Sequence, residues 1–465
     1  MIYITALTGL LVAALYLIHR RPQNSIPNIM GPPSPSWLFG HMRQLLLASR
    51  FGDYEFRWLK HYGAVYRLKG CFGQDRLMVA DPLALQYIVN SPSFCRSPTK
   101  DNIAYLLFGE RSVITATGRV EYCLRILPES IMGVSTQDLG DEFVSNTIQI
   151  VKLSACQSEG HVLADAIGFH LPKWFWRTVM HLPTTTFNAA RTTRQLAKRI
   201  GGLIVRDKMD AAKQGLEISD DLFSRLLNDE VPDKTKKLHE DDIIAHTALI
   251  VIAGQENTAN ALSFGFLELA RHPDFQHKLR TEIYSFRGAG QGNPAYDNMP
   301  LLNAFIKEIL RLYPGLPLSD RVVAQDTVIP LMESITTTTG ERISQIPVAK
   351  GQLVTVAIAS YQRLASQWGE DAHEFNPYRW LKGDVHQGDA VGPYANILTF
   401  LGGPRTCLGW RFAISEMQII FCEVIGKFSF AEPDNDPVRP RFLTSLQPIA
   451  STGGKGLPLS VTRIQ

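Results

Sequence analysis

The sequence predicts a mainly helical body with small β-sheets, and several stretches support this fold class. Residues 240–271 contain no proline and many alanine, leucine and isoleucine residues, so they predict one long helix through the centre. Residues 301–313 predict another strong helix, which stops at the following proline. Residues 322–356 alternate apolar and polar side chains between turn signals and predict short strands, and residues 65–68 and 76–79 predict a small hairpin.

The first residues predict a membrane anchor. Residues 2–18 are uncharged and apolar, and this run of 17 residues is at the short end of the ~17–25 that cross a bilayer. Basic residues follow the run instead of preceding it, which disfavours the alternative of a cleaved signal peptide and places the rest of the chain in the cytosol. We expect residues 1–19 to form a transmembrane helix, residues 20–37 a proline-rich hinge and residues 38–465 one globular body.

The composition is that of a packed globular protein, with 45% hydrophobic and 20% charged residues. The formal net charge is only +3 and the basic residues form no stripe, so we expect no nucleic-acid partner. The six cysteines are irregularly spaced and include no C-x-x-C pair, which disfavours both a zinc site and a disulfide scaffold. Cysteine chemistry is therefore expected from a single residue.

A glycine-rich loop from Phe400 to Gly409 contains one cysteine and stands directly before a predicted helix. Gly403 and Gly409 permit turns and the close approach of a flat macrocycle to the backbone. The dipole of the following helix favours the thiolate form of Cys407, which suits an iron ion. Arg405 is two residues away, where its guanidinium can pair with a carboxylate of a cofactor. The alternative is a buried structural cysteine in a turn.

This loop resembles the haem-binding signature of the cytochrome P450 family, and further segments match the family's landmarks in the expected order. Glu308 and Arg311 resemble the family's Glu-x-x-Arg pair, which without this context would be an exposed helical ion pair. Arg379, in the segment that begins at Phe375, resembles the arginine that joins the pair in a buried network bracing the cysteine loop. The resemblance covers nearly the whole chain and implies the P450 fold, a triangular helical prism around haem b, with residues 38–465 as the haem-thiolate catalytic domain.

Residues 253–258 of the central helix resemble the family's oxygen-activation motif. In that motif a small Ala-Gly pair leaves room for dioxygen, while an acid and a hydroxyl deliver protons; without the family, the same step would indicate close helix packing. Glu256 matches the acid, but Asn257 stands at the usual threonine position and Thr258 follows on a different helical face. Because asparagine has no hydroxyl to rotate, we hypothesise that Glu256 and Asn257 hold a water that carries protons.

Two arginines resemble family positions that contact haem propionates. Arg125 matches the first position, although Glu121 replaces the family's aromatic residue and the stretch 119–140 is abbreviated. Arg321 matches the second, with a surface strand arginine as the alternative.

The predicted pocket walls are mostly apolar, which suits a lipophilic substrate. They are Ile250, Ala253 and Gly254 on the central helix, Leu316 and Leu318 after the second helix, and residues 103–107.

The resemblance implies a monooxygenase of the endoplasmic reticulum membrane that holds haem iron through Cys407 and uses O2. Its electrons would come from NADPH through NADPH–cytochrome P450 reductase, with cytochrome b5 as a second candidate donor. Residues 396–418 are similar to fungal members, many of which modify terpenoids and other secondary metabolites. Two alternatives stay open: a haem-thiolate isomerase or dehydratase without O2 activation, which Asn257 would mark, and a degenerate, non-catalytic relative with a damaged 119–140 stretch.

Overall fold

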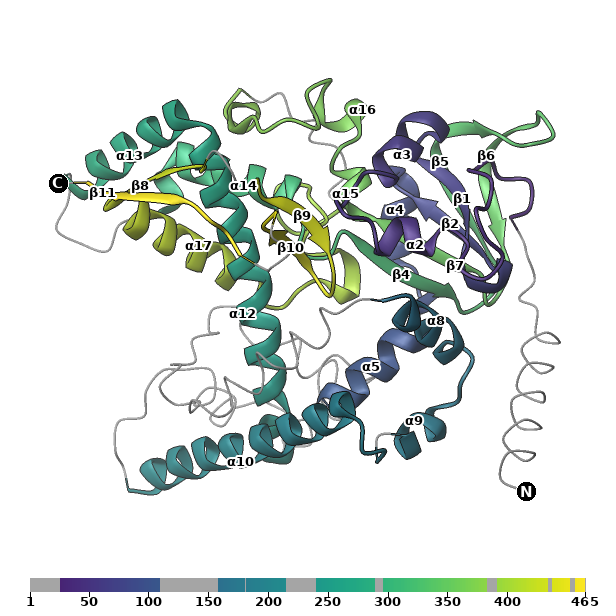
Figure 1. Cartoon of the computed structure of the whole chain (residues 1–465), viewed down its shortest axis with the longest axis horizontal. Helices are drawn as coiled ribbons and strands as arrows, with labels where there is room; N and C mark the ends of the chain where they lie inside the picture. Colours follow the sequence, from purple (N-terminus) through teal and green to yellow (C-terminus); the bar gives the residue numbers. More distant parts are fainter. Residues whose placement is uncertain are drawn as a thin grey trace.

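The structure, a computed structural model, describes residues 26–108, 158–179, 181–214, 240–288, 296–382, 391–433, 437–451 and 456–464. Within these ranges the chain is mostly helical, and its strands form small sheets, as the sequence predicts (Figure 1). The helices are α2 (Met42–Leu46), α3 (Glu55–Tyr62), α4 (Pro82–Asn90), α5 (Pro98–Phe108), α8 (Glu159–Gly168), α9 (Lys173–Val179), α10 (Thr185–Lys213), α12 (Glu240–Arg271), α13 (Pro273–Gly288), α14 (Pro300–Leu312), α15 (Ile358–Tyr361), α16 (Ala365–Trp368) and α17 (Trp410–Ile425).

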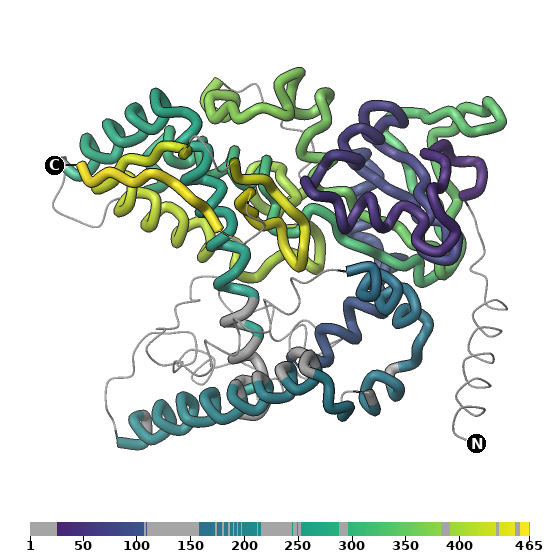
Figure 2. The backbone as a smooth tube through the Cα atoms, viewed as in Figure 1, coloured from purple at the N-terminus to yellow at the C-terminus, as the bar shows by residue number. Residues whose placement is uncertain are grey.

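The strands are β1 (Val65–Lys69), β2 (Asp75–Val79), β3 (Phe94–Arg96), β4 (Leu318–Val323), β5 (Thr327–Thr336), β6 (Arg342–Val348), β7 (Leu353–Ala357), β8 (Phe428–Ala431), β9 (Arg439–Phe442), β10 (Leu446–Ile449) and β11 (Ser460–Arg463). The largest sheet has the order β1-β2-β7-β4-β3, and three two-stranded pairs complete the set described. The parallel pairing of β2 with β7 brings residues 75–79 beside residues 353–357, as the purple-blue and green tubes of Figure 2 show. Every residue of β7 is buried, which fits its largely apolar sequence, and its one polar side chain, Thr355, donates a hydrogen bond to Asp320.

The long central helix is confirmed with the predicted bounds. α12 is 32 residues long and runs through the middle of the molecule, with α14 and β9–β10 on one side and α17 and β8 on the other (Figure 1). It ends at Arg271 because Pro273 follows and begins the next helix. At Gly265 an added Cβ would lie 2.4 Å from the ring of Phe421 on α17. This glycine therefore permits the close contact of α12 with α17, the helix that follows the cysteine loop.

The chain after the cysteine loop contains more than the one predicted helix. α17 is present, but four short strands, β8 to β11, follow it and pair as β9–β10 and β8–β11. The β9–β10 hairpin packs on α12, since Asn260 Nδ2 donates a hydrogen bond of 3.0 Å to Ser445 Oγ. This hairpin contributes to the candidate active site.

The expected hinge is partly packed on the body. Ile26 and Ile29 are buried, and the backbone carbonyls of Asn28 and Met30 accept hydrogen bonds from Thr338 N and Arg67 N. The end of the proline-rich segment is thus fixed by the β-rich part of the molecule. The expected anchor, residues 1–19, lies outside the described ranges. Within those ranges no helix is both long and apolar enough to cross a bilayer.

Candidate active site

The cysteine loop is held by its own backbone and leaves its thiol accessible. Cys407 N donates to the carbonyl of Phe400 at 2.9 Å, and Thr406 donates to the carbonyl of Gly403 from both its backbone N and its hydroxyl. Phe400 is buried, whereas Cys407 is exposed at the surface of the loop. This is not the burial that a purely structural cysteine would show. The fold therefore presents one thiol in a fixed position, three residues before α17.

The two predicted glycines of the loop differ in what their backbone requires. Gly403 has a φ of +65°, and an added Cβ would lie 2.3 Å from the carbonyl oxygen of Val89 at the end of α4. Only glycine satisfies both conditions there. Gly409 has φ −90° and ψ 15°, which other residues also adopt, so the expected special turn at this position is not observed.

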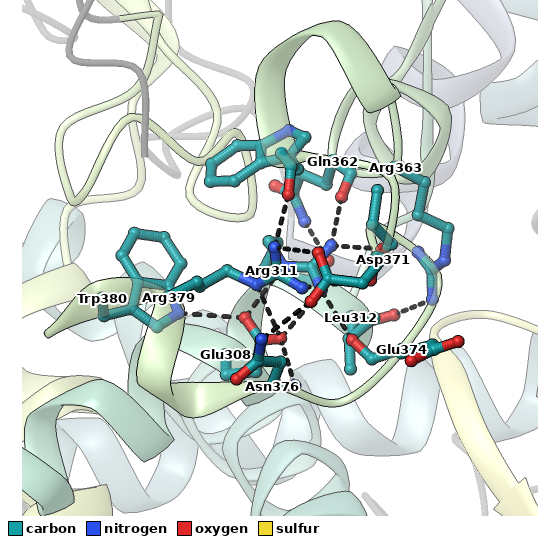
Figure 3. A network of polar contacts seen from close by, with 12 residues as sticks. Glu308, Arg311, Leu312, Gln362, Arg363, Asp371, Glu374, Asn376, Arg379 and Trp380 are labelled. Carbon is teal, nitrogen blue, oxygen red and sulfur yellow. Dashed lines mark hydrogen bonds and ion pairs between the residues drawn. The ribbon is translucent and has the colours of Figure 1, made fainter. Parts of the chain in front are cut away.

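The predicted Glu308, Arg311 and Arg379 are brought together and buried (Figure 3). Both oxygens of the Glu308 carboxylate accept from Arg311, at 2.9 Å each, and Oε1 also accepts from Arg379 Nε at 3.1 Å. Arg311 donates further to the carbonyls of Gln362, Ala372 and Glu374, so all its N–H donors are used. A buried ion pair is stable only when its remaining polar atoms are satisfied in this way.

Gln362 connects this network to the cysteine loop. Its Nε2 donates to the carbonyl of Arg311 at 2.6 Å, while its Oε1 accepts from the backbone N of Leu398 at 2.8 Å. Thr399 Oγ1 also donates to Gln362 Oε1, at 3.1 Å. Gln362 is fully buried and both ends of its amide are used. The residues immediately before Phe400 are therefore tied to the α14 network through one side chain, which the sequence did not predict.

Two of the three predicted cofactor-binding arginines lie near each other. Arg321 on β4 is 7% exposed, and burial together with the charges of Arg96 and Arg405 lowers its pKa to about 10. Within the described residues the Arg321 side chain donates to Ser319 Oγ and to the carbonyl of Asp320 and forms no ion pair, although the nearby charge of Asp320 partly opposes the lowering of its pKa. The alternative of a surface arginine is thus wrong. Arg125 lies outside the described residues.

The three predicted catalytic residues of α12 point to three different neighbours. Glu256 Oε1 accepts from Gln447 Nε2 on β10 at 2.7 Å. Asn257 lies against the loop after α14, where an added Cβ on Gly315 would be 3.1 Å from Asn257 Oδ1. These directions follow from the ~100° rotation per helical residue. The hypothesis that Glu256 and Asn257 share one water therefore has no support from their packing.

Thr258 lies on the side of α12 that contacts α17. It is buried, and its hydroxyl donates to the carbonyl of Gly254 at 3.3 Å. Burial raises the pKa of Glu416 on α17, and a hydrogen bond from Thr258 partly opposes that rise. Thr258 thus forms a contact between α12 and α17, and its predicted catalytic role stays a prediction.

The predicted pocket residues Ile250, Ala253, Gly254, Leu316 and Leu318 lie on α12 and on the segment that runs from the end of α14 into β4. Ile250, Ala253 and Gly254 belong to α12, and Ala253 is exposed. Leu316, in the loop after α14, is exposed to 47%, and Leu318 begins β4. Exposed apolar side chains on facing segments are available to contact an apolar ligand.

Comparisons with known proteins agree with this arrangement. The family model for cytochrome P450 matches residues 163–452. The chain is 26% identical to cytochrome P450 monooxygenase claW of Ampulloclitocybe clavipes, over 97% of this chain and 95% of that protein. It is 28% identical to cytochrome P450 monooxygenase 219 of Postia placenta, over 92% and 93%. Among solved structures, retinoic acid bound cyanobacterial CYP120A1 has a TM-score of 0.64 at 19% identity, covering 94% of this chain and all of that one. The cytochrome P450DA heme domain has a TM-score of 0.65 at 18% identity, with coverage of 95% and 97%.

The fold, the cysteine loop and these similarities define one class: the chain belongs to the cytochrome P450 family. It is an enzyme, a P450 monooxygenase, and its family uses a haem-thiolate iron and O2.

The residues present fit haem. An accessible thiol at Cys407 suits the iron, and Arg405 near the buried Arg321, which forms no ion pair among the described residues, suits anionic propionates.

Proposed function

We propose that this chain is an NADPH-dependent monooxygenase that inserts one oxygen atom of O2 into a small lipophilic substrate, with a terpenoid or another secondary metabolite as the substrate class. The balanced reaction consumes the substrate, O2, NADPH and one proton, and it yields the oxygenated product, NADP+ and water. NADPH–cytochrome P450 reductase supplies the two electrons singly, and cytochrome b5 is a second candidate donor. The chain would act at the endoplasmic reticulum membrane, held by residues 1–19 with the catalytic domain in the cytosol.

The accessible thiol of Cys407 carries this proposal. A thiolate ligand donates electron density to haem iron and favours cleavage of the O–O bond when haem is bound. The chain's contribution is to fix that thiol: the backbone N of Cys407 is tied to Phe400, and the residues before Phe400 are tied to α14 through Gln362. Arg321 and Arg405 would hold the propionates, which orients the macrocycle.

Proton supply is the role that we assign to the α12 side of the site. Glu256 is the ionisable side chain of the segment 253–258, and it is half-buried beside β10. Asn257 places an amide where the family usually has a hydroxyl, so the acid carries more of the proton transfer in this chain.

A lipophilic substrate is supported by the chemistry of the predicted pocket. Ala253 on α12 and Leu316 in the loop after α14 are exposed and apolar. Such walls bind apolar ligands because their burial removes apolar surface from water. The uncharged N-terminal run of residues 2–18 would keep the catalytic domain close to the membrane, where such substrates are concentrated. The secondary-metabolite class comes from the resemblance of residues 396–418 to fungal members of the family.

The first test is a reduced carbon monoxide difference spectrum of the wild type and of Cys407→Ala. The proposal predicts the long-wavelength thiolate Soret band in the wild type and its loss in the variant. The second step adds NADPH and reductase and screens terpenoids for mass gains of one oxygen atom. Absence of the band in folded, haem-supplied protein would refute the proposal. Substrate conversion that proceeds without NADPH would replace it with a haem-thiolate isomerase or dehydratase.

A further inference from the structure

A glutamine on the β9–β10 hairpin holds the acid of α12. Gln447 is fully buried, and its Nε2 donates a hydrogen bond of 2.7 Å to Glu256 Oε1. The two residues are 191 positions apart in the sequence. A hydrogen bond to an ionised carboxylate contributes more than one between neutral groups. The contact is therefore strong enough to select one orientation of the Glu256 side chain.

The neighbours of the Gln447 side chain favour one of the two orientations of its amide group. Its Nε2 also donates to Ser445 Oγ at 3.3 Å, and Ser445 Oγ accepts from Asn260 Nδ2 at 3.0 Å. A flipped amide would place an oxygen against the carboxylate of Glu256, where two acceptors would repel each other. The hairpin itself is anchored, because Leu446 N donates to the carbonyl of Gly315 at 2.8 Å.

The oxygen of this amide has no donor among the described residues. Gln447 Oε1 is buried and accepts no hydrogen bond there. An unpaired buried acceptor destabilises the folded state, and one bound water removes most of that cost. Simple packing would be served better by an apolar side chain of the same shape. The buried Gln447 amide binds Glu256 through its NH2 group and leaves its oxygen available to another donor. This arrangement indicates a role in the chemistry of Glu256.

We propose that Gln447 is a positioning residue for proton delivery: it fixes the carboxylate of Glu256, and its own Oε1 binds a water that extends the proton path. This inference rests on the proposed monooxygenase function. A free glutamate side chain samples several rotamers, and most of them point its carboxyl group away from any one proton acceptor. The hydrogen bond from Gln447 removes that freedom from Glu256, whose neighbour in the sequence, Asn257, offers no hydroxyl.

The test uses full-length protein with haem, reductase and NADPH, and no organic substrate. We would measure the oxygen consumed, the NADPH oxidised and the hydrogen peroxide released, which together give the ratio of peroxide to water formed. This ratio rises when proton delivery is misdirected or slow. Gln447→Met removes the donor while keeping the shape. Gln418→Met is the matched control, because Gln418 is also a buried glutamine with two side-chain hydrogen bonds, to Asp297 and Asn303, away from the site.

A reciprocal variant separates positioning from structure. Glu256→Gln combined with Gln447→Glu restores a hydrogen-bonded amide–carboxylate pair but moves the acid to β10. The proposal predicts that Gln447→Met raises the peroxide-to-water ratio by about tenfold, the factor that corresponds to one hydrogen bond to a charged group. The Gln418→Met ratio stays at the wild-type value. The reciprocal variant recovers the melting temperature of the wild type without recovering its ratio.

Two results would overturn the inference. A wild-type ratio in Gln447→Met shows that Glu256 needs no positioning. Recovery of both the melting temperature and the ratio in the reciprocal variant shows that the pair is structural only. Failure of the proposed function is a distinct result, since the wild type itself would then lack the thiolate Soret band or NADPH-dependent oxygen uptake.

Discussion

Replacing Glu308 by glutamine removes the one negative charge that the buried network is built around. The carboxylate accepts five hydrogen bonds: two from Arg311, and one each from Arg379 Nε, Asn376 N and Trp380 Nε1. A glutamine amide has one acceptor oxygen, so its NH2 group would face two or more of these donors. The guanidinium of Arg311 is completely buried and would lose its counter-charge. Breaking a buried ion pair in this way costs about 3–5 kcal/mol.

That loss is a large share of the ~5–15 kcal/mol that stabilises a typical protein. We therefore expect Glu308→Gln to bind little haem, measured by the carbon monoxide difference spectrum, and to unfold at lower urea concentration. Glu423→Gln is the control, because Glu423 is half-exposed and pairs with the exposed Arg287 at 2.6 Å. Such surface pairs contribute at most about 1 kcal/mol. Equal urea midpoints and equal haem content for the Glu308 and Glu423 variants would refute the argument that burial makes the difference.

Two further predictions follow from buried groups. Gln362→Met keeps the side-chain volume but removes the hydrogen bonds that connect Arg311 to Leu398. We therefore expect the variant to transfer its haem to apomyoglobin faster than the wild type, with Gln418→Met as the control. An unchanged rate of haem loss would show that this connection is dispensable. Burial raises the pKa of Glu55 from 4.5 to about 7, so the folded state holds a proton that the unfolded state releases. The contribution of Glu55 to the free energy of unfolding is therefore greatest below pH 4.5. It falls by up to about 3 kcal/mol as the pH rises from 4.5 through 7. Glu55→Gln should flatten this loss in urea unfolding at pH 5 and pH 8, and parallel losses in both proteins would contradict it.

The long helices and the cysteine loop could be predicted because their signals are local. α12 and α17 occupy the predicted residues 240–271 and 410–425, since a proline-free apolar run and a glycine-rich start need no distant partner. The pairing of Glu308 with Arg311 is also local, being one turn of α14. Its complete burial was inferred only from the family resemblance.

The contacts that link distant segments could not be predicted from the sequence. Gln447 reaches Glu256, and Gln362 reaches both Arg311 and Leu398, across intervals that no periodicity reports. The strands β8 to β11 have four residues each, which is too short for an alternating pattern to be distinct from loop. The direction of Thr258 toward α17 likewise depends on how two helices pack.

These contacts divide the site into two parts with separable consequences. On the cysteine side, a fully satisfied buried network fixes the loop through Gln362, so changes there act on whether the thiol is in place to hold iron. On the α12 side, the β9–β10 hairpin fixes an acid through a single amide whose other end is open, so a change there leaves the iron ligand alone. Variants of the first part should therefore alter haem content and stability together. Variants at Gln447 should alter the fate of the consumed oxygen at constant haem content, because the hydrogen bonds of the Gln447 side chain go to Glu256 and Ser445, whereas those of Gln362 hold the residues before the cysteine loop.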